Sequence, residues 1–202
     1  MTVPMDATAE PEATSGLRLG GLVPPVVLVG VAGGLVSLSL GFYAQLHDPA
    51  AEQTISLIFS NTLALKAWFT TGAVMLAVFQ LYSALRFWGK VNRPRQVPSW
   101  FGDAHRLSGT LALLLTLPVA YHCLWALGFD FTDTTGQTRR LVHSLLGCFF
   151  YGAFAAKMIV LRGPRTPGWM LPLLGGAVVT ALVGIWFTTS LWYFTSISFP
   201  GF

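Results

Sequence analysis

Long runs of apolar residues constrain the fold of this chain more than any other feature. A helix needs about 20 apolar residues to cross the ~30 Å hydrocarbon layer of a bilayer. Five stretches meet this requirement and predict helices over about residues 22–46, 58–86, 104–129, 138–161 and 169–197. Lys66 and Lys157 are the charged residues within their apolar cores. The sequence therefore predicts an all-α integral membrane protein with five transmembrane helices.

The composition agrees with a lipid environment. Charged residues make up 10% of the 202 residues, against roughly 25% in soluble domains, and the mean hydropathy is +0.62. The basic residues are few and lie between apolar runs, so the pI of about 9.4 does not indicate a nucleic-acid partner. Cys123 and Cys148 both lie in apolar segments, which predicts packed free thiols and no disulfide framework.

The N-terminal segment differs from the rest of the chain. Residues 1–20 are acidic and predict a disordered cytoplasmic tail, followed by one five-helix domain over residues 21–202. The first apolar run is too long for a signal peptide, and the residues before it lack the basic character of one.

The distribution of Lys and Arg predicts the orientation in a bacterial plasma membrane. Two basic residues lie in loops on one side, Arg139 and Arg140. Eight lie on the other side: Arg18, Arg86, Lys90, Arg93, Arg95, Arg106, Arg162 and Arg165. This difference predicts a cytoplasmic N-terminus and an external C-terminus.

Two histidines flank the loop between the third and fourth helices. His122 precedes the predicted end of one helix and His143 follows the start of the next, which puts both roughly 8–10 Å below the outer surface. Consecutive helices joined by a short loop are normally antiparallel neighbours. Two imidazoles at one depth on such helices have the geometry for bis-histidine ligation of a haem iron. Simple hydrogen bonding between the helices is the alternative.

Small and aromatic residues near these histidines fit the haem hypothesis. Gly147 lies on the helical face of His143 and would let a flat macrocycle approach the backbone. Phe150 and Phe154 continue this face, and Pro118 is placed to bend the helix that carries His122. All four residues also have an ordinary packing interpretation in a membrane helix.

Lys66 lies at the depth predicted for His122 and His143. Its ammonium group is a candidate to neutralise a haem propionate, or it snorkels towards the head groups. His47 follows the first helix and is either a substitute ligand or an exposed loop residue.

His105 and Lys157 lie near the cytoplasmic ends of their helices. His105 is a candidate ligand for a second, inner haem, although the inner side has no other histidine to complete a pair. Lys157 is a candidate to contact a haem propionate or a quinone carbonyl, and snorkelling is the alternative.

The segments "DAHRLSGT…PVAYHC" and "RRLVHSLLGCFFYGAFAAK" resemble the cytochrome b561-like and ferric-reductase-like haem-b membrane proteins. The resemblance covers roughly residues 55–197 and implies a four-helix core, with one extra helix, that holds haem b between histidines. Many members hold two haems; here Lys157 stands where a second histidine of the fourth helix is expected. The overall pattern also resembles a group of uncharacterised small actinobacterial membrane proteins.

The leading hypothesis is a b-type cytochrome that carries electrons within or across the membrane through a haem held by His122 and His143. The donor would be a quinone or a redox partner subunit, because no nucleotide-binding or iron–sulfur motif is present. The protein would then be an electron-transfer protein or a subunit of a membrane oxidoreductase. The alternative is a haem-free membrane anchor, scaffold or transport protein.

Overall fold

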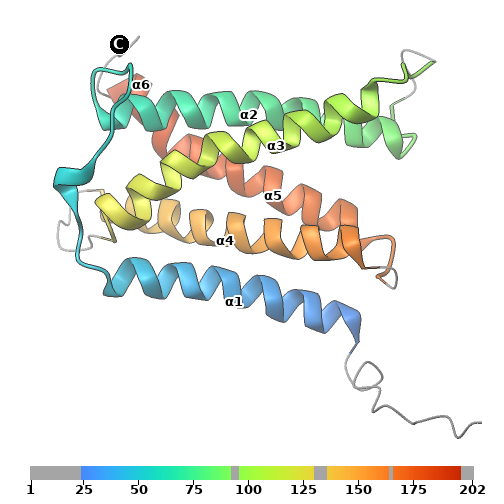
Figure 1. The fold of residues 1–202 in the computed structure, drawn as a ribbon, viewed down its shortest axis with the longest axis horizontal. Helices are drawn as coiled ribbons and strands as arrows, with labels where there is room; N and C mark the ends of the chain where they lie inside the picture. Colours follow the sequence, from blue (N-terminus) through green and yellow to red (C-terminus); the bar gives the residue numbers. More distant parts are fainter. Residues whose placement is uncertain (1–23, 92–95, 130–135, 164–165, 197–202) are drawn as a thin grey trace, which may run out of the picture.

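The computed structural model describes residues 24–91, 96–129, 136–163 and 166–196, so the predicted N-terminal tail lies outside the described residues. The described part of the chain is all-α (Figure 1). Its elements are α1 (Pro25–Leu46), η2 (Ala51–Gln53), α2 (Thr62–Phe87), α3 (Phe101–Tyr121), η3 (His122–Ala126), α4 (Gln137–Arg162), α5 (Met170–Trp186), η4 (Phe187–Leu191) and α6 (Trp192–Ser196).

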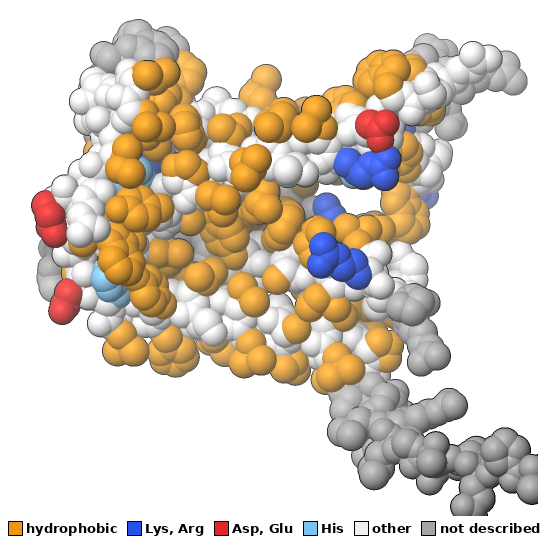
Figure 2. All heavy atoms as spheres, viewed as in Figure 1, with side chains coloured by type: hydrophobic (Ala, Val, Ile, Leu, Met, Phe, Trp, Pro, Cys, Tyr) orange, Lys and Arg blue, Asp and Glu red, His pale blue; other side chains and the backbone are white. Residues whose placement is uncertain are grey.

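The prediction of five membrane-spanning helices is confirmed. Five helical segments are long and apolar enough to cross a bilayer, with η3 continuing α3 and with η4 and α6 continuing α5. Apolar side chains cover most of the face seen in Figure 2, and the Lys and Arg side chains visible there gather towards one end. Large residues such as Leu35, Phe42 and Met75 are exposed, as expected of side chains that contact lipid.

The start of α2 lies about four residues after the predicted position because Asn61 caps the helix. The Asn61 side chain accepts a hydrogen bond from the Ala64 N–H at 2.9 Å. Such a cap satisfies one of the N–H groups that a helix leaves unpaired at its first turn.

Replacing Asn61 with alanine is expected to destabilise the protein by about 1 kcal/mol. In a chain of this length, that loss lowers the thermal midpoint of unfolding by about 2–4 °C. Thermal unfolding in detergent measures the shift, and Asn61→Asp, which keeps an acceptor oxygen, is the matched control. An unchanged midpoint in Asn61→Ala would show that the cap does not contribute to stability.

The helices pack as two groups joined through α5. α2 lies beside α3, α4 lies between α1 and α5, and α5 also contacts α2 (Figure 1). α3 and α4 are antiparallel, as the sequence predicts, but the expectation that they are direct neighbours is wrong. Their main packing partners are other helices, and side chains bridge the space between them.

Small residues allow α2, α4 and α5 to meet closely in the centre of the bundle. The buried cluster there consists of Ala73, Ala77, Phe150, Ala181, Leu182 and Ile185. Helix association in lipid depends on such close packing, because lipid tails are as apolar as leucine side chains.

The contact between α1 and α4 is closer still. A Cβ atom added to Gly33 would lie 2.8 Å from the Gly152 carbonyl oxygen and 3.0 Å from the Ala156 Cβ. A Cβ added to Gly152 would clash with Ser37 and with the Gly33 backbone. The two glycines therefore set the distance between these helices.

Two wide helical turns lie at one end of the bundle. η3 and η4 are π-helical: η3 ends one membrane-spanning helix, and η4 interrupts another near its C-terminal end. We call this end of the bundle the His143 end, because His143 lies near the start of α4 there. The opposite end of the bundle is the His105 end. π-Helical turns in α-helices are rare and occur often at functional sites.

Candidate functional site: a cavity lined by Lys66, Cys123 and His143

A cavity of about 480 Å³ opens at the His143 end. It falls in the range of roughly 300–1,000 Å³ that is typical of cofactor and small-ligand sites. Its apolar lining includes Leu63, Leu127, Phe129 and Trp192. Its polar lining includes Lys66, Cys123, Arg139, Arg140, His143 and Thr189.

His143 is held in one orientation by two threonines of η4. Its Nδ1 lies 3.1 Å from Thr188 Oγ1 and 2.8 Å from Thr189 Oγ1. The Thr188 hydroxyl already donates to the carbonyl groups of Gly184 and Ile185, so it accepts a hydrogen bond from His143 Nδ1–H. With the ring proton assigned to Nδ1 in this way, the lone pair of the ring is on Nε2.

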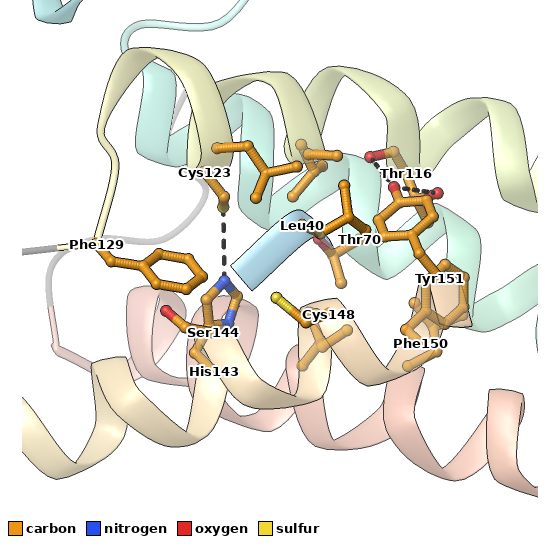
Figure 3. Close-up of a pocket in the computed structure, with 16 residues that line it drawn as sticks. Leu40, Thr70, Thr116, Cys123, Phe129, His143, Ser144, Cys148, Phe150 and Tyr151 are labelled. Atoms are coloured by element: carbon orange, nitrogen blue, oxygen red, sulfur yellow. Dashed lines mark hydrogen bonds between the residues drawn. The ribbon is translucent and has the colours of Figure 1, made fainter. Parts of the chain in front are cut away.

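Cys123 faces that lone pair across the space between α3 and α4 (Figure 3). Its Sγ lies 3.6 Å from His143 Nε2, and Lys66 lines the same cavity. The thiol thus lies beside the His143 imidazole in a cavity that the Lys66 side chain also lines.

Three basic residues give the cavity a positive lining. The Lys66 side chain is 7% exposed, although it carries a charge. Arg139 donates to the Thr188 carbonyl at 2.7 Å and stacks over the Trp192 ring at 3.9 Å. Arg140 also lines the cavity, and the described lining residues include no carboxylate. This lining favours an anionic ligand.

A smaller apolar pocket of about 50 Å³ adjoins the cavity and shares Cys123, Phe129 and His143 with it. Cys148 lines this pocket, and a Cβ added to Gly147 would meet no atom within 4 Å. At the far side of the pocket, the Tyr151 hydroxyl donates to the Thr116 carbonyl at 3.0 Å and so bridges α4 to α3. Gly147 lines this small pocket and does not line the larger cavity. Phe150 also lines this small pocket, and it packs in the buried core.

The structure does not place His122 on the cavity. The side chain is 0% exposed, and both ring nitrogens bond to the backbone. Nδ1–H donates to the Pro118 carbonyl at 2.7 Å, and Nε2 accepts the Ile55 N–H at 3.0 Å. His122 therefore ties η3 to the connection between α1 and α2, and its lone pair is engaged there.

His47 lies in an aromatic stack. Its ring centroid is 4.2 Å from Trp125 and 5.1 Å from Tyr43. His47 Nε2 is buried and has no hydrogen-bond partner among the described residues. The ring does not line the cavity. Nothing in the structure decides between the two predictions, a substitute ligand and an exposed loop residue, so both stay open.

His105 belongs to a separate polar group at the other end of the bundle. Its Nδ1 lies 2.6 Å from the Ser83 hydroxyl, and the Gln80 amide donates to Ser108 at 2.7 Å and to the His105 carbonyl. Lys157 and Gln80 line a pocket of about 60 Å³ there. No other histidine lies in this group, so the structure supplies no histidine pair for a second haem.

Sequence reasoning missed several residues of the cavity. Cys123 was expected to be a packed thiol, and Arg139 only a topology signal. No sequence pattern predicted a role for Thr188 and Thr189, because a pair of polar residues near the end of a long apolar helix is common. The neighbouring positions of Lys66 and His143 were found from their equal predicted depth.

The fold and the site define a class: a multi-pass, all-α integral membrane protein with a positively lined cavity at one end of its bundle. The described residues contain no group of three or more His, Cys, Asp or Glu side chains that could hold a metal ion. Residues 26–201 match the model of the family of unknown function DUF6529, and the chain belongs to that family. No curated protein and no solved structure was found to match the chain.

Proposed function

We propose that this protein is a b-type cytochrome that holds one haem in the cavity at the His143 end. The observation that carries the proposal is His143 itself. Its Nδ1 is fixed by Thr188 and Thr189, and its ring lines a cofactor-sized cavity, with Nε2 3.6 Å from Cys123 Sγ. A hydrogen bond to the second ring nitrogen is the usual way to orient a histidine that ligates a metal.

The rest of the cavity also suits a porphyrin carrying two carboxylates. Lys66, Arg139 and Arg140 supply positive charge for the propionates, and the aromatic and aliphatic lining suits the ring. Haem supplies one-electron transfer when bound. The resemblance to cytochrome b561-like proteins supports the same function.

His122 does not fit the second axial position in this structure. Its Nε2 lone pair accepts the Ile55 N–H, so it becomes a ligand only if that bond breaks. The proposal therefore assigns haem binding first to His143. The charge asymmetry of the loops supports placing the His143 end outside, with a quinone or a partner subunit as the electron donor.

The visible spectrum tests this function. The protein, expressed with supplied haem and purified in detergent, is expected to show a b-type α band in the reduced-minus-oxidised spectrum, at about one haem per chain. His143→Ala is expected to lose the band, because the ligating nitrogen is gone. His105→Ala, at the opposite end, is the matched control and is expected to keep it. A colourless preparation of the folded protein would overturn the proposal.

A second candidate function is the binding or transport of another amphipathic anion without haem. The positive lining favours it, as does the engagement of the His122 lone pair by the backbone. A colourless protein that binds a fluorescent fatty carboxylate, and loses this binding in Lys66→Met, would support this function over the first.

A further inference from the structure

We propose that the pocket lined by Lys157 at the His105 end binds one anionic phospholipid, with the lipid phosphate at Lys157 and part of one acyl chain inside the pocket. The inference goes beyond the proposed cytochrome and does not depend on haem, because no residue of this pocket lines the cavity at the His143 end. It gives Lys157 a bound lipid as its partner in place of general contact with head groups.

The pocket of about 60 Å³ lies among four helices, α2, α3, α4 and α5. α3 packs mainly on α2, α4 packs on α5, and α2 packs on α5, so helix packing leaves the side between α3 and α4 uncovered. In Figure 2, the surface is hollowed at this end, and Lys and Arg side chains lie on both sides of the hollow. The hydrogen bond from the Tyr151 hydroxyl to the Thr116 carbonyl spans the same space nearer the His143 end. The pocket therefore opens towards lipid between α3 and α4.

The lining of this pocket suits an acyl chain. Apart from Gln80 and Lys157, the lining residues are glycine or apolar, and they include Leu113, Phe154 and Val178. The volume is far below the roughly 300–1,000 Å³ of typical cofactor sites. The pocket thus has room for a short stretch of a narrow chain and does not fit a large ring system.

Lys157 is the charged group of this pocket, and no described residue supplies its counterion. No hydrogen bond or ion pair joins it to another residue that the structure describes. The Gln80 amide donates to Ser108 and to the His105 carbonyl, and the described lining residues include no carboxylate. A charged group in an apolar setting requires a partner of opposite charge, and here the opening admits one from the bilayer.

Lys157 also lies within reach of the phosphate layer. It precedes Arg162, which is in the last turn of α4, by five residues, or roughly 8 Å along the helix axis. The long lysine stem lets the ammonium group extend towards the head groups. Arg162 is exposed and adds a second positive charge. Basic pockets between membrane helices bind anionic head groups, whereas a zwitterionic lipid brings a cation that these two residues repel.

Native mass spectrometry of the purified protein in a neutral detergent tests the charge preference. The probes are dioleoyl phosphatidylglycerol, which is anionic, and dioleoyl phosphatidylcholine, which is zwitterionic. The first bound lipid is expected to be phosphatidylglycerol when both are present in equal amounts. Lys157→Met is expected to weaken phosphatidylglycerol binding about fivefold, the effect of one basic residue at an anionic surface, and to leave phosphatidylcholine binding unchanged. Lys90→Met, which removes a charge at the same end but outside the pocket, is the matched control.

Filling the pocket provides an independent variant. A Cβ atom at Gly175 or at Gly176 meets no atom within 4 Å, but of the two residues Gly175 lines the pocket. A leucine at Gly175 therefore takes the space proposed for the acyl chain without a clash at its Cβ. Gly175→Leu is expected to weaken phosphatidylglycerol binding several-fold, and Gly176→Leu is the matched control that keeps it.

Several results would overturn the proposal. One is equal binding of the two lipids by the unmodified protein, and another is unchanged phosphatidylglycerol binding in Lys157→Met or in Gly175→Leu, each shown to be folded by gel filtration and thermal unfolding. Binding of glycerol 3-phosphate that depends on Lys157 would identify a site for a free anion instead. Displacement of the lipid by an equal amount of decylubiquinone would identify a quinone site. The readout requires no haem, so a colourless protein that retains phosphatidylglycerol contradicts only the cytochrome.

Discussion

Replacing Gly152 with leucine is expected to separate α1 from α4. The backbone of Gly152 already lies against Gly33 and Ser37, so a larger side chain has no room unless the helices move apart. Overpacking of this kind costs about 1–3 kcal/mol, which lowers the thermal midpoint by roughly 2–12 °C in a chain of this length. Thermal unfolding in detergent measures the loss.

A cysteine crosslink reports the helix contact directly. A Cβ atom at Gly41 lies 3.9 Å from Cys148 Sγ, so Gly41→Cys should crosslink to Cys148 under mild oxidation in a Cys123→Ser background. The crosslink is expected to disappear when Gly152→Leu is added. Gly34→Leu is the matched control, because a Cβ at Gly34 meets no atom within 4 Å. A crosslink that persists in Gly152→Leu would contradict the close packing of the two helices.

Replacing His122 with alanine is expected to destabilise the protein whether or not it carries haem. The change leaves the Ile55 N–H and the Pro118 carbonyl without the imidazole and opens a void where a fully buried ring lay. A lost partner for a buried N–H and a core void together cost about 2–4 kcal/mol. The thermal midpoint should fall by roughly 4–16 °C.

The matched control for this change is Tyr121→Phe. The Tyr121 hydroxyl donates to the Gln53 carbonyl at 3.0 Å in an exposed position, so its loss should cost less than about 0.5 kcal/mol. If His122→Ala loses a haem band but keeps its thermal midpoint, His122 is a ligand and the backbone bonds do not determine its role. A large fall in the thermal midpoint of His122→Ala, measured on protein without haem, would show that His122 has a structural role.

Much of the fold could be predicted because the apolar runs have the length that a bilayer requires. Depth along a helix was equally predictable, since the rise per residue is fixed, and this placed Lys66 and His143 at one level. The sequence does not specify lateral neighbours in the same way. The length of the loop predicted that α3 packs directly beside α4. In the structure, the close packing of Gly33 against Gly152 places α1 beside α4 instead.

The orientation of side chains near the cavity was the least predictable feature. A helical wheel assumes 100° per residue, but the π-helical turns at His122–Ala126 and Phe187–Leu191 change that angle. Residues within both turns, and those that follow η4 in α6, therefore face directions that a regular helix would not give them. The role of His122 also depends on the Ile55 amide, a backbone group that no residue pattern reveals.

The contact between α1 and α4 has a consequence for how the protein is made. Gly33 emerges from the ribosome long before its partner Gly152, which follows about 120 residues later. At roughly 5–20 residues per second, α1 spends about 6–24 s in the bilayer before α4 exists. Its uncharged sequence, Pro25–Leu46, lets it wait there alone as a stable span. The contact between α1 and α4 can therefore form only after the fourth helix has been made.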